Sequence, residues 1–111
     1  MTRKYNEEKR GWFHKPPRSD LKYTLKTARI DDPYYGFGDS DNAFIGLHIT
    51  LRSGEGISSF HLYDEEDIKQ LLIQFYVRRV QDLEGKIVEL FQPEKYSVAG
   101  FRVAEHLLPR R

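Results

Sequence analysis

Two histidines on neighbouring predicted strands are the residues of this sequence best placed to do chemistry. His48 and His61 stand on either side of a turn predicted at residues 53–56. If the flanking residues pair as a hairpin, Arg52 opposes Ile57, and the same register places His48 opposite His61. Two imidazoles so placed could bind zinc together with a carboxylate. No third ligand lies close to them in the sequence, so we predict no metal site.

Other catalytic arrangements find little support in the sequence. Ser58 and Ser59 lie inside a predicted strand, without the sharp nucleophile turn or the oxyanion glycines of a hydrolase. The run 39–41 (Asp-Ser-Asp) opens like a calcium loop, but the glycine and the closing glutamate of such a loop are missing. A phosphate-cradling glycine loop is also missing. We therefore predict a protein that is not an enzyme and that carries no cofactor.

The face of the hairpin that carries the histidines is a candidate binding surface. Arg52 and Tyr63 fall on the same side as His48 and His61. In an OB-fold this surface binds single strands or sugars, through stacking on rings and cationic contact with phosphates. The acidic residues of segment 31–42 count against phosphate binding. An ordinary solvated sheet face is the simpler interpretation, and binding of single-stranded nucleic acid is retained as the alternative.

A second set of candidate contacts is aromatic. Residues 1–20 show no periodicity and are predicted to form a flexible basic tail, in which Trp12 and Phe13 follow Arg10. Such residues are frequent hot spots, so the tail is either a docking arm for a protein partner or a cover for part of the core. Segment 31–42 is predicted to be a long loop, and long ordered loops are often functional. Its aromatic residues complete the predicted partner-binding set: Tyr34, Tyr35 and Phe37.

One strong helix signal positions the remaining elements. Asp64 is a good N-cap, and the apolar residues of 68–80 follow the i, i+3, i+4 rule. Ile73 and Val77 widen the apolar arc, so they either are buried or face a partner chain. Arg79 falls in the predicted last turn, where contact with the helix dipole or its terminal carbonyls is expected.

The strands predicted around this helix define the fold class. Alternation predicts a strand from residue 21, with a bulge after Thr27 where the apolar parity shifts. The hairpin, the helix and two further strands at 86–91 and 97–104 follow. The order strand, strand, strand, helix, strand, strand is that of an α+β domain. It fits an OB-like five-stranded barrel or an open antiparallel sheet on one helix. We expect one domain over residues 21–108.

The composition of the chain indicates the cellular compartment in which we expect the protein. The chain has 111 residues, no cysteine and a formal net charge of +1. It has no disulfide framework, which fits a reducing cytoplasm. No apolar run reaches the length of a membrane span, and the N-terminus lacks the apolar core of a signal peptide. We expect a cytoplasmic protein with no membrane partner.

Several short segments stand out between residues 26 and 91: Thr27-Ala28-Arg29-Ile30, the run 44–51, Leu62-Tyr63-Asp64, Leu71-Leu72 and 80–88, which contains Leu-Glu-Gly-Lys-Ile-Val. Through these segments, residues 26–91 resemble a group of small, largely uncharacterised proteins encoded by phages and mobile elements. The resemblance implies a phage setting and a non-enzymatic accessory protein that binds a host protein complex. An inhibitor of a host defence complex, such as a CRISPR effector, is one such role. The oligomeric state stays open, a dimer included.

Overall fold

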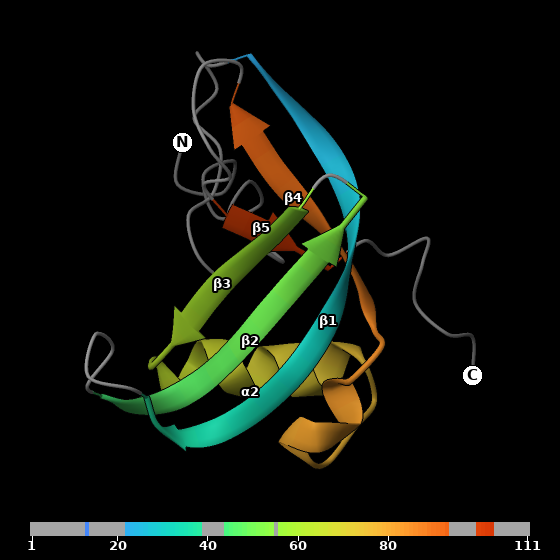
Figure 1. Ribbon diagram of the computed structural model, residues 1–111. Coiled ribbons are helices and arrows are strands. Elements are labelled where there is room, and N and C mark those ends of the chain that lie inside the picture. The colour runs from blue at the N-terminus through green and yellow to red at the C-terminus, as the bar shows by residue number, and fades with distance from the viewer. Residues whose placement is uncertain (1–12, 14–21, 39–43, 55, 94–99, 104–111) are drawn as a thin grey trace, which may run out of the picture.

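The fold is an antiparallel five-stranded sheet packed on one main helix, which confirms the predicted α+β class. The computed structural model describes residues 13, 22–38, 44–54, 56–93 and 100–103. Between the third and fourth strands lie the helix and one short 3₁₀ turn (Figure 1). The elements in chain order are β1 (Tyr23–Phe37), β2 (Ile45–Ser53), β3 (Gly56–Leu62), α2 (Glu65–Gln74), η1 (Val80–Leu83), β4 (Ile87–Pro93) and β5 (Gly100–Arg102).

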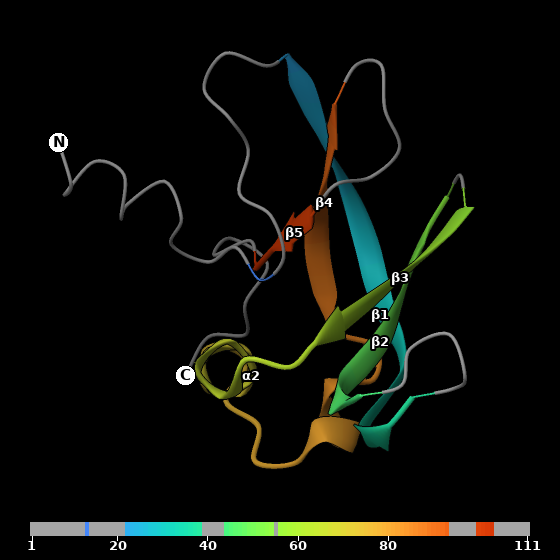
Figure 2. The same ribbon diagram turned by 90° about the vertical axis from the view of Figure 1, so that its left-hand side faces the viewer.

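The strand order makes the sheet a Greek key. In the order β3-β2-β1-β4-β5, β4 returns to lie beside β1 after the first three strands. β5 then pairs antiparallel with β4 at the edge of the sheet. This is the topology of the partly open OB barrel. The sheet curls so that its edge strands approach each other (Figure 2). Phe60 of β3 contacts Phe101 of β5 there, with ring centroids 5.1 Å apart.

The long strand β1 corrects the prediction of a loop over residues 31–42. Residues 31–37 continue β1 and pair with β2, so more than half of the segment predicted as a loop is strand. Asp32 and Pro33 together oppose Ile49, which is a bulge, and Asp32 adopts a left-handed φ of 49°. The N–H of Asp32 donates to the Glu84 carboxylate at 2.9 Å. The turn-forming residues therefore bend the strand without ending it.

The predicted bulge after Thr27 is wrong. β1 pairs with β4 without interruption from Tyr23 to Arg29. The apolar parity shifts because the buried face of the ladder changes along its length. Ala28 faces the main core, whereas Phe91 is buried on the opposite face, with the Tyr23 ring edge-on to it at 4.7 Å.

The β2–β3 hairpin has the predicted register. Leu47 opposes Leu62, and Ile49 opposes Phe60, and all four side chains are buried. Ser53 still pairs with Gly56, so the connection has two residues rather than four. The predicted apolar side of the hairpin therefore faces the core.

The helix begins where the sequence predicts and ends earlier. The Asp64 carboxylate accepts from the N–H of Glu66 at 2.9 Å, which confirms the N-cap. Beyond Gln74 the N–H of Tyr76 donates to Ile73 O at 3.0 Å, and that of Val77 to Leu72 O at 3.1 Å. These two bonds form a Schellman motif, with a tyrosine in the left-handed position that glycine usually takes (φ 58°). The predicted helix over 68–80 is therefore wrong in its last six residues.

The residues after the helix explain why its pattern was misleading. Val77 and Val80 still pack against the core, although neither lies in α2, so the apolar spacing continues past the helix end. Arg79 does not cap the helix. Its guanidinium pairs with Asp82 in η1 at 3.3 Å.

The core is one cluster between the inner face of the sheet and α2, and it includes a residue predicted in the tail. Phe13 is 3% exposed, its ring lies 5.6 Å from that of Phe101, and its N–H donates to Phe101 O at 3.1 Å. Phe13 therefore covers the core, and it is not available as a partner anchor. Among the described helices, none is long and apolar enough to cross a membrane.

Candidate functional site

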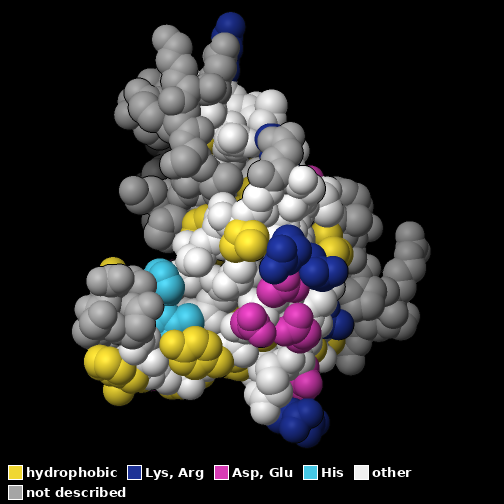
Figure 3. Space-filling view, viewed as in Figure 1, with side chains coloured by type: hydrophobic (Ala, Val, Ile, Leu, Met, Phe, Trp, Pro, Cys, Tyr) yellow, Lys and Arg dark blue, Asp and Glu magenta, His cyan; other side chains and the backbone are white. Residues whose placement is uncertain are grey.

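The outer face of the sheet carries a row of three rings across three strands. Tyr34 of β1 opposes His48 of β2, which opposes His61 of β3. Figure 3 shows the two histidines side by side on this face. His48 is only 5% exposed, so the expectation of two solvated histidines is wrong for this one. The tyrosine ring stacks on it with centroids 4.9 Å apart.

The contacts of His48 determine how the pair is protonated when it is neutral. His48 Nε2 lies 3.0 Å from Gly36 O, and its Nδ1 lies 2.8 Å from His61 Nδ1. A carbonyl only accepts, so Nε2 of His48 carries the hydrogen and its Nδ1 accepts. His61 then donates from Nδ1. The pair ties β3 and β2 to the end of β1, and both nitrogens of His48 are engaged.

Two further rings complete this cluster. Phe44 lies 5.2 Å from His48 and 6.0 Å from His61, and its ring meets that of Tyr63 edge-on at 4.8 Å. Tyr63 is 72% exposed and stands at the rim. The structure thus brings together three of the four residues predicted for nucleic acid: His48, His61 and Tyr63. Phe44 was not predicted, because a single aromatic residue before a strand carries no distinguishing signal.

Arg52, the fourth predicted residue, lies two rows further along the face in an ion-pair group. Its Nε donates to Asp31 at 2.7 Å, and Arg29 Nε donates to the same carboxylate at 2.9 Å. Hydrogen bonds from Arg29 and then from Arg52 lower the pKa of Asp31 below its ordinary 3.8. Figure 3 shows basic and acidic side chains adjoining on this part of the face. The local charge is therefore mixed.

Strand alternation separates the three aromatic residues predicted for a partner. Tyr34 points to the outer face, where its hydroxyl donates to Phe37 O at 3.1 Å. Tyr35 opposes the buried Leu47, and Phe37 opposes Ile45, so these side chains lie on the inner face, at the end of the sheet. The loop prediction treated the three as one set, which a strand does not allow.

Inner-face residues at the end of the sheet and two residues of the adjoining helix α2 together form what we call the apolar surface: Tyr35, Phe37, Ile45, Leu72 and Ile73. Four of its members are more than half exposed, from 51% for Ile73 to 63% for Ile45. A hollow of about 410 Å³ opens between β1 and the helix, lined by Tyr35, Glu65, Ile68, Lys69, Leu72 and Ile73. Of the two residues predicted to face a partner or the core, Ile73 is exposed, whereas Val77 packs against the core.

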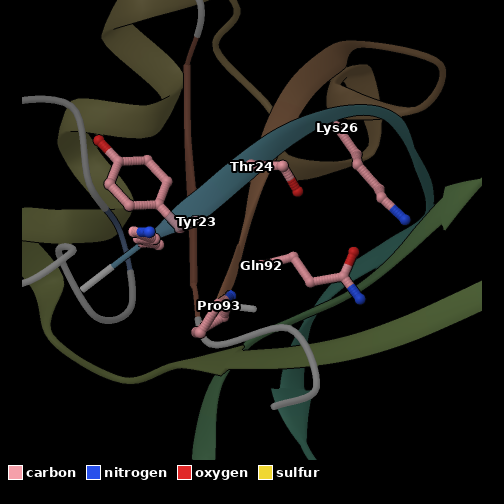
Figure 4. Close-up of a pocket in the computed structure, with 6 residues that line it drawn as sticks. Tyr23, Thr24, Lys26, Gln92 and Pro93 are labelled. Atoms are coloured by element: carbon pink, nitrogen blue, oxygen red, sulfur yellow. The ribbon is translucent and has the colours of Figure 1, made fainter. Parts of the chain in front are cut away.

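A third candidate site is a hollow of about 440 Å³ at the far end of the β1–β4 ladder. Thr24, Lys26 and Gln92 project into the same space there, with Pro93 at the edge (Figure 4). Amide, hydroxyl and ammonium groups such as these occur in many surface clefts, so they indicate no particular ligand or reaction.

Two predicted contacts, Arg10 and Trp12, lie outside the described residues. Within the described ranges, no group of three His, Cys, Asp or Glu side chains is placed to hold a metal ion. No family model, curated protein or solved structure matches this chain. The candidate sites are therefore weighed on their geometry.

Proposed function

We propose that this protein works by binding another protein through the apolar surface, as a phage-type accessory protein. The observation that carries the proposal is the exposure of Tyr35 and Ile73 at one hollow, continued along the inner face of the sheet by the exposed pair Phe37 and Ile45. Contiguous exposed apolar patches mark interaction sites on protein surfaces. From the sequence resemblance, we propose a host protein complex in the host cytoplasm as the partner and its inhibition as the outcome.

The chemistry of the apolar surface favours a protein partner. Aromatic side chains bury large areas at low entropic cost and dominate the energetics of interfaces. Glu65 and Lys69 stand beside the hollow with opposite charges, which is the arrangement of a polar rim around an apolar centre. A partner with an exposed apolar ridge flanked by polar groups would fit it.

The contacts of His48 count against a role for this residue as a general base. A general base needs a free nitrogen within reach of a substrate proton. His48 uses one ring nitrogen on Gly36 O and the other on His61, so its contacts give it a structural role.

Two adjacent tyrosines provide a matched experiment. Tyr35 is 53% exposed and Tyr34 is 47% exposed, and they point to opposite faces of one strand. Tyr35→Ser should weaken capture of the partner at least tenfold, since hot-spot aromatics contribute about 2 kcal/mol or more. Tyr34→Ser should leave it unchanged. Capture that survives Tyr35→Ser and is lost in Tyr34→Ser would refute the proposal.

The outer face supports a second candidate, binding of single-stranded nucleic acid. The specific observation is the aligned row Tyr34–His48–His61 on an OB-ordered sheet, with Arg29 and Arg52 opposed to each other further along. Rings would stack bases, and guanidinium groups would contact phosphates.

A gel-shift series across salt concentrations tests this second candidate. Binding by phosphate contact weakens steeply as salt rises, and Arg52→Gln should reduce the salt slope by roughly one. The absence of any shift at low salt, with both DNA and RNA oligonucleotides, would exclude it.

A further inference from the structure

The edge strand β3 lacks the features that protect sheet edges. Its sequence, Gly56–Leu62, contains no Lys, Arg, Asp, Glu or Pro. Its seven pairs with β2 run without a bulge. Charges, prolines and bulges are the usual means of blocking edge-to-edge pairing. Figure 2 looks onto this edge, and no other described element lies in front of it.

The pairing pattern identifies the backbone groups that point outward. Ser53 and Gly56 close a two-residue connection, so they form a hydrogen-bonded pair. Hydrogen-bonded and non-hydrogen-bonded pairs alternate in an antiparallel ladder, which turns the N–H and C=O of Ile57 and Ser59 away from β2. Within the described part of the chain, these outward groups meet no other strand.

We propose that β3 pairs antiparallel with β3 of a second copy of this chain, about a two-fold axis at Ser58. In this register Ile57 of one copy opposes Ser59 of the other, and the reverse. All four outward N–H groups and carbonyls of these residues are then hydrogen-bonded. The strand contains no Lys, Arg, Asp or Glu, so self-pairing places no two such like charges opposite each other. The two sheets become one continuous sheet.

Side chains at the axis favour a second copy over an unrelated strand. Ser58, a small residue, faces its own symmetry mate. Ile57 is 58% exposed, and the register makes the two isoleucines diagonal neighbours, within reach of each other on the outer face. An exposed apolar side chain of the edge is thereby covered by its own copy, as an isologous interface requires.

The absence of cysteine in this sequence allows a direct test of the register. In Ser58→Cys the two thiols lie on a directly opposed, non-hydrogen-bonded pair, where Cα atoms are about 4.5 Å apart and a disulfide can form. In Ser59→Cys they lie on a diagonal, about 7–8 Å apart, beyond disulfide reach. Mild oxidation of the full chain should give a covalent dimer from the first variant and little from the second. Equal yields, or a higher yield from Ser59→Cys, would overturn the register.

Sedimentation equilibrium tests the association without cross-linking. The full chain should show a reversible monomer–dimer equilibrium. Ser59→Pro should abolish it, because proline removes an outward N–H that the ladder with β2 does not use. The melting curve of Ser59→Pro should stay close to that of the parent, which shows that the variant folds. A chain that stays monomeric at every concentration would overturn the proposal.

A variant of the apolar surface separates this inference from the proposed function. Ile73→Lys places a charge at the hollow beside α2, away from β3, and should leave the dimer intact while weakening partner capture. A dimer lost in Ile73→Lys and kept in Ser59→Pro would show that the copies meet at the apolar surface instead. If Ser59→Pro lowers capture of another protein while the parent is monomeric, the edge receives a strand of that protein, and the second copy is refuted.

Discussion

Gly46 of β2 lies directly against the backbone of β3, and its replacement by alanine tests the packing of the hairpin. A Cβ at this position would lie 2.4 Å from Leu62 O and 3.0 Å from the Phe44 ring. Ordinary contact starts at 3.4 Å. The carbonyl belongs to the backbone of a buried strand residue, so it cannot swing away as a side chain would. The two strands would have to separate by about 1 Å in a close-packed region.

The cost follows from two opposing effects. Overpacking of this kind destabilises a protein by about 1–3 kcal/mol. Replacing glycine by alanine stabilises by about 0.4–1 kcal/mol through the unfolded chain, where the native backbone tolerates a side chain. Gly46→Ala should therefore lower the free energy of unfolding by roughly 1–2 kcal/mol. With a urea m-value near 1–1.5 kcal/mol/M, the midpoint falls by about 1 M.

Two other glycines are the controls, measured by urea unfolding monitored by circular dichroism. Gly54, in the turn, has nothing within 4 Å of an added Cβ, so Gly54→Ala should be neutral or slightly stabilising. Gly85 also has open space, but its φ is +84°, so Gly85→Ala should cost about 1 kcal/mol through backbone strain alone. A Gly46→Ala midpoint equal to that of Gly54→Ala would refute the reasoning.

Three further outcomes follow from contacts elsewhere in the fold. The paired arginines hold the pKa of Asp31 below 3.8, so its stabilisation is present above that value and is lost as pH falls through the folded pKa. Asp31→Asn should thus have a lower urea midpoint than the parent at neutral pH, with the difference closing well below pH 3.8. Nitrogen NMR at neutral pH should show His48 protonated at Nε2 and His61 at Nδ1; the opposite tautomers would contradict the paired-ring geometry. Phe13→Ala should cost about 3–5 kcal/mol in unfolding free energy, whereas an exposed tail residue would cost almost none.

Much of the fold was predictable because period-2 alternation is strong in the central hairpin. A single register satisfied both faces of β2 and β3, and Asp64 marked the helix start. The sequence did not predict the early end of α2 for two reasons. Tyr76 takes a left-handed position that glycine usually holds, and the apolar spacing of the helix continues through Val77.

The candidate site was less predictable, because residues typical of turns lie within a strand. Asp32 and Pro33 are typical turn residues, yet they form a bulge within β1, so Tyr34 and Tyr35 alternate on a strand. The apolar surface depends on that alternation and on Ile73, far away in the sequence, lining the same hollow as Tyr35. The burial of His48 was hidden because it depends on the rings that cover it.

Site-specific photo-crosslinking tests whether the protein binds a protein partner through the apolar surface. A photoreactive phenylalanine analogue at Phe37 lies on that surface, and the same analogue at Tyr34 lies on the outer face of the same strand. In host lysate, we expect one specific covalent adduct from position 37, lost when Ile73→Lys is added, and none from position 34. Adducts from position 34 alone would contradict it.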